Sequence, residues 1–176
     1  MNSFDKEQMQ QRILQHVKKD GTRRFVDTIY QDMDCIDRVV EYLTEPYAGK
    51  VDVVAAPAVS GYILGSMIAR ELKVPFVPIM KADNQENSSG EDFLMASYLD
   101  HADMVRTMKL RKGALAKGAK VLLVDNWIET AATITACQSL IEVAEAEVLG
   151  IAAFGRDENA ATDKLADSGL VHAAAE

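Results

Sequence analysis

The sequence predicts an α/β fold in which a parallel sheet is flanked by helices and carries one antiparallel hairpin. Mainly apolar segments at 51–56, 120–124 and 148–154 predict strands, and the continuous run in 120–124 is typical of a parallel strand that is covered on both faces. Helical patterns alternate with these runs, as a parallel sheet requires. The segments 93–98 and 104–110 lie close together along the chain, and the second alternates in side-chain character, so they predict a β-hairpin.

The N-terminal part of the chain is expected to be mainly helical. Apolar residues at helical spacing from Met9 predict a first helix that ends near Lys19, with Asp5 in a capping box at its start. Residues 24–30 are compatible with a short strand or with an irregular link. A second helical pattern covers 35–43.

The first strand of the predicted core, 51–56, continues into a turn at 57–61 and a helix at 63–72. A second strand is expected at 76–79, where prolines limit the hydrogen bonds that it can form. The polar, Gly- and Ser-containing segment 82–92 is expected to be a mobile loop.

In the second half of the chain, the run 120–124 predicts the central strand of the sheet. A helix is expected at 131–144, and 148–154 is the last clear strand. The Ala-rich tail after Asp157 carries little pattern.

Length and linker content predict a single domain, 1–176. We divide it into an N-terminal helical segment, 1–50, which we call the hood, and a core, 51–156.

Composition and charge exclude several function classes. The net charge of −8 argues against a nucleic-acid partner, because neutralising phosphates needs clustered Lys and Arg. No stretch contains the roughly 18 consecutive apolar residues of a membrane-spanning helix. Residues Met1–Lys19 lack an apolar signal-peptide core, so the expected compartment is the cytoplasm. Cys35 and Cys137 lie in apolar contexts without metal-ligand spacing and are expected to be core thiols.

The most informative segment of the chain is 121–133. Four apolar residues lead into Asp125 and Asn126, and a short Thr- and Ala-containing turn then precedes a helical pattern. Ligands of parallel α/β sheets bind beyond the carboxyl ends of the strands. Three loops reach that edge here, namely 57–61, 80–92 and 125–133.

In order and spacing, the segments from about Val51 to Phe154 resemble the type I phosphoribosyltransferases, specifically the adenine phosphoribosyltransferase branch. The strongest match is 121–133. There the resemblance implies that Asp125 and Asn126 hold the ribose hydroxyls. It also implies that a four-residue turn surrounds the 5-phosphate: Thr130, Ala131, Ala132 and Thr133.

The turn departs from the family pattern, because Asn126 replaces an acid and Ala131 and Ala132 replace glycines. If the turn needs a positive φ angle, an alanine there is strained by roughly 1 kcal/mol or more. If it does not, the alanines only stiffen the start of the helix. An ordinary strand–helix junction with Thr130 as the N-cap is the structural alternative.

Three further residues match the family near the diphosphate. Ser60 occupies the position of a family arginine in the pyrophosphate loop, and Gly61 allows a close backbone approach. A serine hydroxyl cannot reproduce the bidentate contact of an arginine, and Ser60 as a plain N-cap is an equal alternative. Lys81 ends a strand where the family carries a lysine that reaches the pyrophosphate, although a lysine at a strand end is usually solvated.

The hairpin corresponds to the family flap, which closes over the substrate. Asp100 and Asp103 are candidates for the flap carboxylate that handles the purine ring, with Tyr98 and His101 nearby. An ordinary solvated loop residue is the alternative for each of these four. Trp127 is expected either to stack on the base or to fill the core.

The resemblance implies transfer of a phosphoribosyl group from phosphoribosyl diphosphate to a purine-like base. Asp125 and Glu129 are the candidate catalytic residues, Glu129 as a base or as a stabiliser of positive charge. Mg²⁺ is the implied cofactor, chelated by the diphosphate rather than by a protein site, with Asp125 as a candidate contact. The implied partners are the two substrates and a second copy of the chain in a homodimer. The alternative is a non-catalytic sensor that binds a nucleotide or phosphoribosyl diphosphate.

Overall fold

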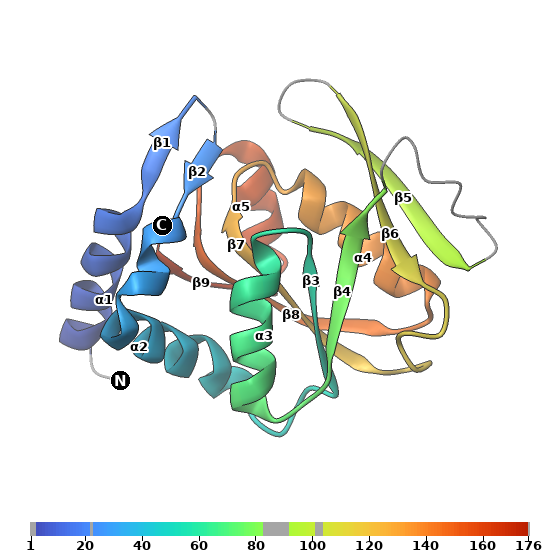
Figure 1. Cartoon of the computed structure of the whole chain (residues 1–176), viewed down its shortest axis with the longest axis horizontal. Helices are drawn as coiled ribbons and strands as arrows, with labels where there is room; N and C mark the ends of the chain where they lie inside the picture. Colours follow the sequence, from blue (N-terminus) through green and yellow to red (C-terminus); the bar gives the residue numbers. More distant parts are fainter. Residues whose placement is uncertain (1–2, 22, 83–91, 101–103, 176) are drawn as a thin grey trace.

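The computed structural model describes residues 3–21, 23–82, 92–100 and 104–175. Over these residues the chain forms one sheet of seven strands and a separate sheet of two strands. Figure 1 shows the helices arranged around the large sheet, with the small sheet beside the N-terminal helices. The expected loop at 82–92 lies largely outside the described residues.

The large sheet has the strand order β5-β6-β4-β3-β7-β8-β9. Five strands are parallel: β3 (Val53–Pro57), β4 (Phe76–Lys81), β7 (Lys120–Ile128), β8 (Glu147–Arg156) and β9 (Val171–Ala175). The antiparallel pair β5 (Phe93–Leu99) and β6 (Val105–Arg111) joins the edge of β4. The predicted fold class and the predicted hairpin are therefore confirmed.

The helices cover both faces of this sheet. One core layer joins α1 (Ser3–His16), α2 (Met33–Thr44) and α3 (Gly61–Leu72) to one face. The other layer places α4 (Ala132–Val143), with Leu165 of α5 (Ala160–Ala166), against the opposite face. Successive residues of the central strand alternate between the two layers, because side chains of a strand point to opposite faces. Cys35 and Cys137 are free and buried, as expected of core thiols.

The hood differs from its prediction near residue 17. Helix α1 ends at His16, and β1 (Lys18–Asp20) pairs antiparallel with β2 (Arg23–Phe25). The side chains of β1 are exposed, so no apolar face there holds a continued helix. Because α1 begins at Ser3, Asp5 lies inside the helix, and the predicted capping box is wrong.

Two short 3-10 helices complete the hood. The first, η1 (Asp27–Gln31), follows β2, so residues 24–30 are part strand and part helical turn. The second, η2 (Glu45–Tyr47), follows α2.

The tail after Asp157 is ordered, although the sequence showed little pattern there. Helix α5 begins with a capping box in which Asn159 accepts from the backbone of Thr162 and the Thr162 hydroxyl accepts from Asn159. Strand β9 then adds to the sheet beside β8. Its buried residues are alanines, which have low β-propensity and hide the strand from a pattern search.

The division into a hood and a core stays a prediction.

Across 3–21, 23–82, 92–100 and 104–175, every helix falls short of the length and apolar content that a membrane span requires.

Candidate functional site

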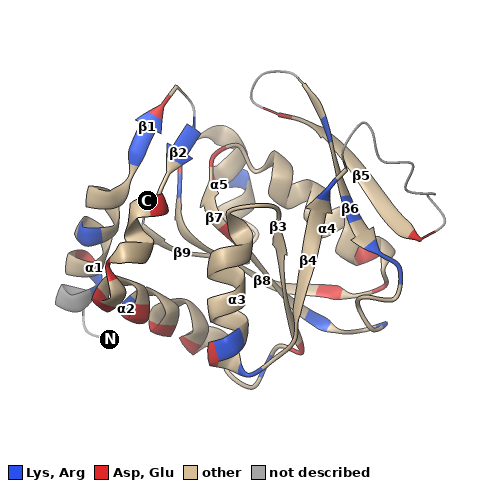
Figure 2. Ribbon diagram, in the orientation of Figure 1, with Lys and Arg blue, Asp and Glu red and all other residues tan. Residues whose placement is uncertain are grey.

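The carboxyl ends of β3, β4 and β7 meet at one edge of the sheet, beside the hood and the hairpin. A cavity of about 420 Å³ lies there, lined by parts of β2, η1, β4, β5 and β7 and by the loop before α3. Figure 2 shows Lys and Arg on β2 and at the ends of β4 and β6 near this edge. The cavity contains six of the predicted site residues: Ser60, Lys81, Asp125, Asn126, Glu129 and Thr133.

Asp125 and Asn126 lie within strand β7 rather than in a loop. The expected strand ended at Val124, but β7 continues to Ile128 because β8 pairs with it over the same length. The prediction that the loop begins at residue 125 is therefore wrong. The consequence is a rigid backbone beneath both residues, which fixes the side chains that line the cavity.

The Asp125 carboxylate is buried, with 9% of the residue exposed. Its pKa is raised to about 7, mainly by burial and also by the charge of Glu129, against the lowering effects of the Asn126 N–H and of Lys81. The Asn126 N–H donates to Oδ1 of Asp125 at 2.8 Å. A Cβ atom at Gly61 would lie 3.2 Å from that oxygen, so the glycine allows the start of α3 to approach the carboxylate. Asp125 therefore exchanges its proton near neutral pH.

The turn after β7 adopts the conformation for which its sequence is least suited. Ala131 has φ 61° and ψ −11°, in the left-handed region that favours glycine. Ala131 is the N-cap of α4 and Ala132 is its first helical residue, so Thr130 is not the N-cap. The N-cap side chain is a methyl group and makes no capping hydrogen bond, so the first N–H groups of α4 are suited to an anionic ligand. The positive φ that the family glycines suggest is present at Ala131 only.

The two alanines should respond oppositely to replacement by glycine. Ala131→Gly removes the left-handed strain and should raise the free energy of unfolding by about 0.5–1 kcal/mol. Ala132→Gly puts a flexible residue into a helix and should lower it by about 0.5–1 kcal/mol. Urea unfolding of the two variants tests this, and the same sign for both would contradict the assigned turn.

Thr130 and Thr133 flank the two alanines of the turn between β7 and α4. The Thr133 hydroxyl donates to Oη of Tyr98 in β5 at 3.2 Å, which joins the hairpin to the turn. Thr130 and Thr133 also line an adjoining cavity of about 370 Å³ together with Lys81. Ala131 and Ala132 face neither cavity; they line a separate hollow beside α5.

Ser60 and Lys81, the residues predicted to lie near the pyrophosphate, both line the cavity. Ser60 is the N-cap residue of α3 by position, as the alternative interpretation expects, but its side chain makes no capping hydrogen bond. The Ala58–Val59 peptide bond before it is cis. Lys81 is the last residue of β4, and it is close enough to lower the pKa of Asp125.

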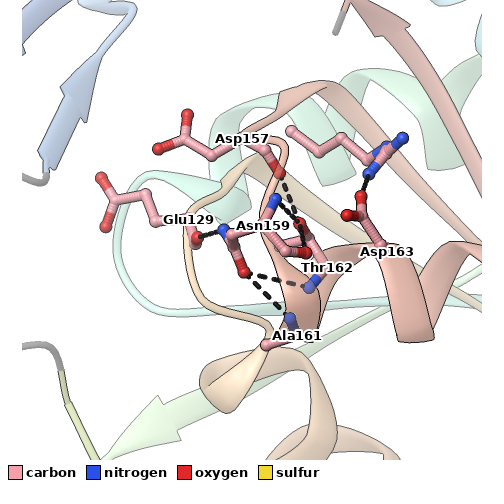
Figure 3. Close-up of polar contacts among 7 residues, drawn as sticks. Glu129, Asp157, Asn159, Ala161, Thr162 and Asp163 are labelled. Atoms are coloured by element: carbon pink, nitrogen blue, oxygen red, sulfur yellow. Dashed lines mark hydrogen bonds and ion pairs between the residues drawn. The ribbon is translucent and has the colours of Figure 1, made fainter.

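Glu129 is engaged with the hood. Its Oε1 accepts from the backbone N–H of Arg24 at 2.5 Å, and its backbone oxygen accepts from Nδ2 of Asn159 at 2.8 Å. Figure 3 shows the second of these contacts, together with the capping box of α5. Glu129 thus connects β2, β7 and α5 around the cavity, and its catalytic role stays a prediction.

At the hairpin tip, the side chain of Asp100 binds groups of the opposite arm of the hairpin. Its carboxylate accepts from Nε of Arg106 at 2.7 Å and from the backbone of Met104 at 3.0 Å. Asp103 and His101 lie outside the described residues. Tyr98 is the hairpin residue that reaches the cavity.

Trp127 fills the core, and its stacking on a base stays a prediction. It is 7% exposed and packs so closely on Gly155 that a Cβ there would lie 2.4 Å from the indole ring. Its Nε1 donates to Oδ1 of Asp157 at 2.8 Å, and part of the residue lines the cavity. Trp127 is therefore mainly a core residue that also contributes to the site.

The sequence did not indicate the contribution of the hood. Arg23, Arg24, Phe25 and Tyr30 all line the cavity, and Arg24 forms an ion pair with Asp157 at 2.8 Å. The pKa of the Tyr30 hydroxyl is raised by burial and, to a smaller extent, by the charge of Asp125. The hydroxyl is therefore close enough to interact with that carboxylate. Strand β2 has only three residues, too few for a period to be recognised.

A parallel sheet with a cavity at its carboxyl edge places the protein among the ligand-binding α/β folds. Residues 26–169 match the phosphoribosyl transferase domain. Because this match covers most of the chain, the protein belongs to the phosphoribosyl transferase domain family.

Its relatives specify the branch. The chain is 34% identical over 128 residues to an adenine phosphoribosyltransferase of Beijerinckia indica, which covers 72% of this chain and 68% of the relative. It is 35% identical over 128 residues to an adenine phosphoribosyltransferase of Brucella anthropi, which covers 72% of this chain and 67% of the relative. The resemblance to the adenine phosphoribosyltransferase branch is confirmed.

Solved structures agree on the fold. The adenine phosphoribosyltransferase of Thermoanaerobacter pseudethanolicus has a TM-score of 0.80 at 23% identity, covering 94% of this chain and 98% of that one. The Saccharomyces cerevisiae enzyme has a TM-score of 0.74 at 19% identity, covering 97% and 98%. That structure was solved with an imino-altritol bisphosphate and adenine.

Proposed function

We propose that this protein transfers a phosphoribosyl group from phosphoribosyl diphosphate to adenine, giving AMP and pyrophosphate. One observation carries the proposal. The buried carboxylate of Asp125 shares a single cavity with the cation Lys81 and with Thr133 in the first turn of α4. Curated relatives above 30% identity with the name adenine phosphoribosyltransferase support the choice of reaction and base.

Such a transfer needs positioning and charge neutralisation more than covalent help from the protein. Asp125 and Asn126 hold the ribose hydroxyls from the end of β7. The N–H groups at the start of α4 bind the 5-phosphate, with Thr130 and Thr133 supplying hydroxyls. Lys81 offsets the negative charge of the leaving pyrophosphate.

The hairpin supplies shielding from water. Tyr98 is already hydrogen-bonded to Thr133 of the phosphate turn at 3.2 Å, so the hairpin lies against the site. Excluding water strengthens every electrostatic interaction with a positively charged sugar in the transition state. Glu129, on the cavity wall, is placed to stabilise that charge or to accept a proton from the base.

We extend the proposal to Mg²⁺ held mainly by the substrate. In the described part of the chain, no group of three His, Cys, Asp or Glu side chains forms a metal site. The oxygens of Asp125, Asn126 and Glu129 share the cavity, and Mg²⁺ is commonly bound by one or two carboxylates together with substrate phosphates. When bound, the ion would neutralise charge on the diphosphate. A homodimer and a cytoplasmic location stay predictions.

A direct assay tests the reaction. Protein, phosphoribosyl diphosphate, Mg²⁺ and adenine should yield AMP and pyrophosphate in equal amounts, separated by chromatography. Hypoxanthine and guanine are run beside adenine. Binding of phosphoribosyl diphosphate without product from any base would favour the sensor. The departures at Asn126 and Ser60 are the reason to test for a sensor, because they weaken the contacts with the diphosphate more than the contacts with the ribose.

A further inference from the structure

We propose that Asp157 is a positioning residue for the base, because it holds both Arg24 and Trp127 in the wall of the cavity. The inference rests on the proposed function. The cavity that contains Asp125 and Asn126 is also lined by the planar side chains of Arg24, Phe25 and Trp127. Planar side chains suit a flat purine ring.

Each oxygen of the Asp157 carboxylate has its own partner. Oδ1 accepts from Nε1 of Trp127 and Oδ2 pairs with Nη2 of Arg24, both at 2.8 Å. The side chains of Arg24 and Asp157 are 14% and 19% exposed, so this ion pair is largely removed from water. One carboxylate thus joins the hood to the central strand.

The backbone of Asp157 is held on both sides. Its N–H donates to the oxygen of Ile128 at 3.0 Å, and its oxygen accepts from the Thr162 hydroxyl at 2.5 Å. Figure 3 shows the second contact beside the capping box of Asn159. The carboxylate is therefore presented from a fixed point and can set the positions of its two partners.

Arg24 retains one donor for a ligand. Within the described residues, its Nη1 is buried and has no hydrogen-bond partner. A buried donor without an acceptor is unfavourable, and a ring nitrogen of a purine is an acceptor that would relieve the cost. The geometry predicts that Arg24 contacts the base and that Asp157 acts on the base through Arg24 and Trp127.

The test compares two ligands that differ in the base. AMP and phosphoribosyl diphosphate are titrated by calorimetry into the wild type, Asp157→Asn and Asp157→Ala. Asp157→Ala should weaken AMP at least tenfold and change phosphoribosyl diphosphate less than twofold. Asp157→Asn keeps an acceptor for the indole and should lose less AMP affinity than Asp157→Ala.

Fluorescence gives a readout that does not depend on ligands. Trp127 is the only tryptophan of the chain, so its emission reports the contact with Asp157. Asp157→Ala should shift the emission of the free protein, and Asp157→Asn should shift it less. Asp163→Asn is the control. Asp163, on α5, pairs with Arg156 at 2.8 Å, and its replacement should change the affinity for neither ligand.

Equal losses for the two ligands, or unchanged AMP affinity in Asp157→Ala, would overturn the positioning role while leaving the proposed function intact. If Asp157→Ala does not fold, the same criteria apply to Asp157→Asn, with a threefold loss of AMP expected. A wild type that binds neither ligand would overturn the proposed function and this inference with it.

Discussion

Replacing Asp125 by asparagine should remove most of the affinity for phosphoribosyl diphosphate and should also stabilise the fold at neutral pH. A hydrogen bond to a charged acceptor contributes about 1.5–3 kcal/mol, against about 0.5–1.5 kcal/mol for a neutral one, so replacing the carboxylate by an amide should weaken binding about tenfold. Asp125→Ala should abolish binding without unfolding the protein. Calorimetry measures the loss, and unchanged affinity in both variants would remove Asp125 from the site.

The gain in stability has a defined pH dependence. Burial raises the folded-state pKa of Asp125 to about 7, from an ordinary value of 3.8. A raised carboxyl pKa makes its contribution to stability fully present below about pH 4 and lost as the pH rises through 7. Three pKa units correspond to roughly 4 kcal/mol, an upper estimate of the advantage of Asp125→Asn at pH 8.

Thermal unfolding at pH 4 and pH 8 measures this difference. The wild type and Asp125→Asn should have similar unfolding temperatures at pH 4, and Asp125→Asn should have the higher unfolding temperature at pH 8. Asp37→Asn, an exposed change on α2, is the control and should show no such separation. A wild type that equals Asp125→Asn at both pH values would contradict a buried, proton-exchanging carboxylate.

Gly155→Ala should destabilise the protein and displace Trp127 in the wall of the cavity. The added methyl would lie 2.4 Å from the ring of Trp127, which is 7% exposed and has little room to move. Overpacking of this kind typically costs about 1–3 kcal/mol. Urea unfolding should show that loss, and the emission of Trp127 should change with it.

A second substitution isolates the cause. Trp127→Phe replaces the indole by a smaller ring, so Gly155→Ala should cost less in that background than in the wild type. The coupling between the two changes measures the contact directly. Equal costs in the two backgrounds would contradict the close packing of Trp127 on Gly155.

Much of the fold could be predicted because it depends on local pattern. Apolar runs marked the parallel strands, and the hairpin was recognisable from its alternation. The order of these elements also predicted which loops meet at one edge, so Asp125, Lys81 and Ser60 were correctly expected to share a cavity. In each case the signal lies in a few neighbouring residues.

The unpredicted parts depend on contacts between distant segments. Arg24, Trp127 and Asp157 come from three different strands or their ends and meet only in the folded chain. Strand β9 is recognisable by its pairing with β8, since its alanines carry no strand signal. The φ of Ala131 was left open because the backbone conformation there is set by the junction of β7 and α4 rather than by the residue.

The most direct test of the account is a calorimetric titration with phosphoribosyl diphosphate and, separately, AMP, each with and without Mg²⁺. We predict that the wild type binds phosphoribosyl diphosphate and that Mg²⁺ strengthens this binding, because the ion and Lys81 share the charge of the diphosphate. Binding of AMP alone would contradict the transferase and favour a sensor. No binding of either ligand would contradict the assignment of the cavity beside Asp125.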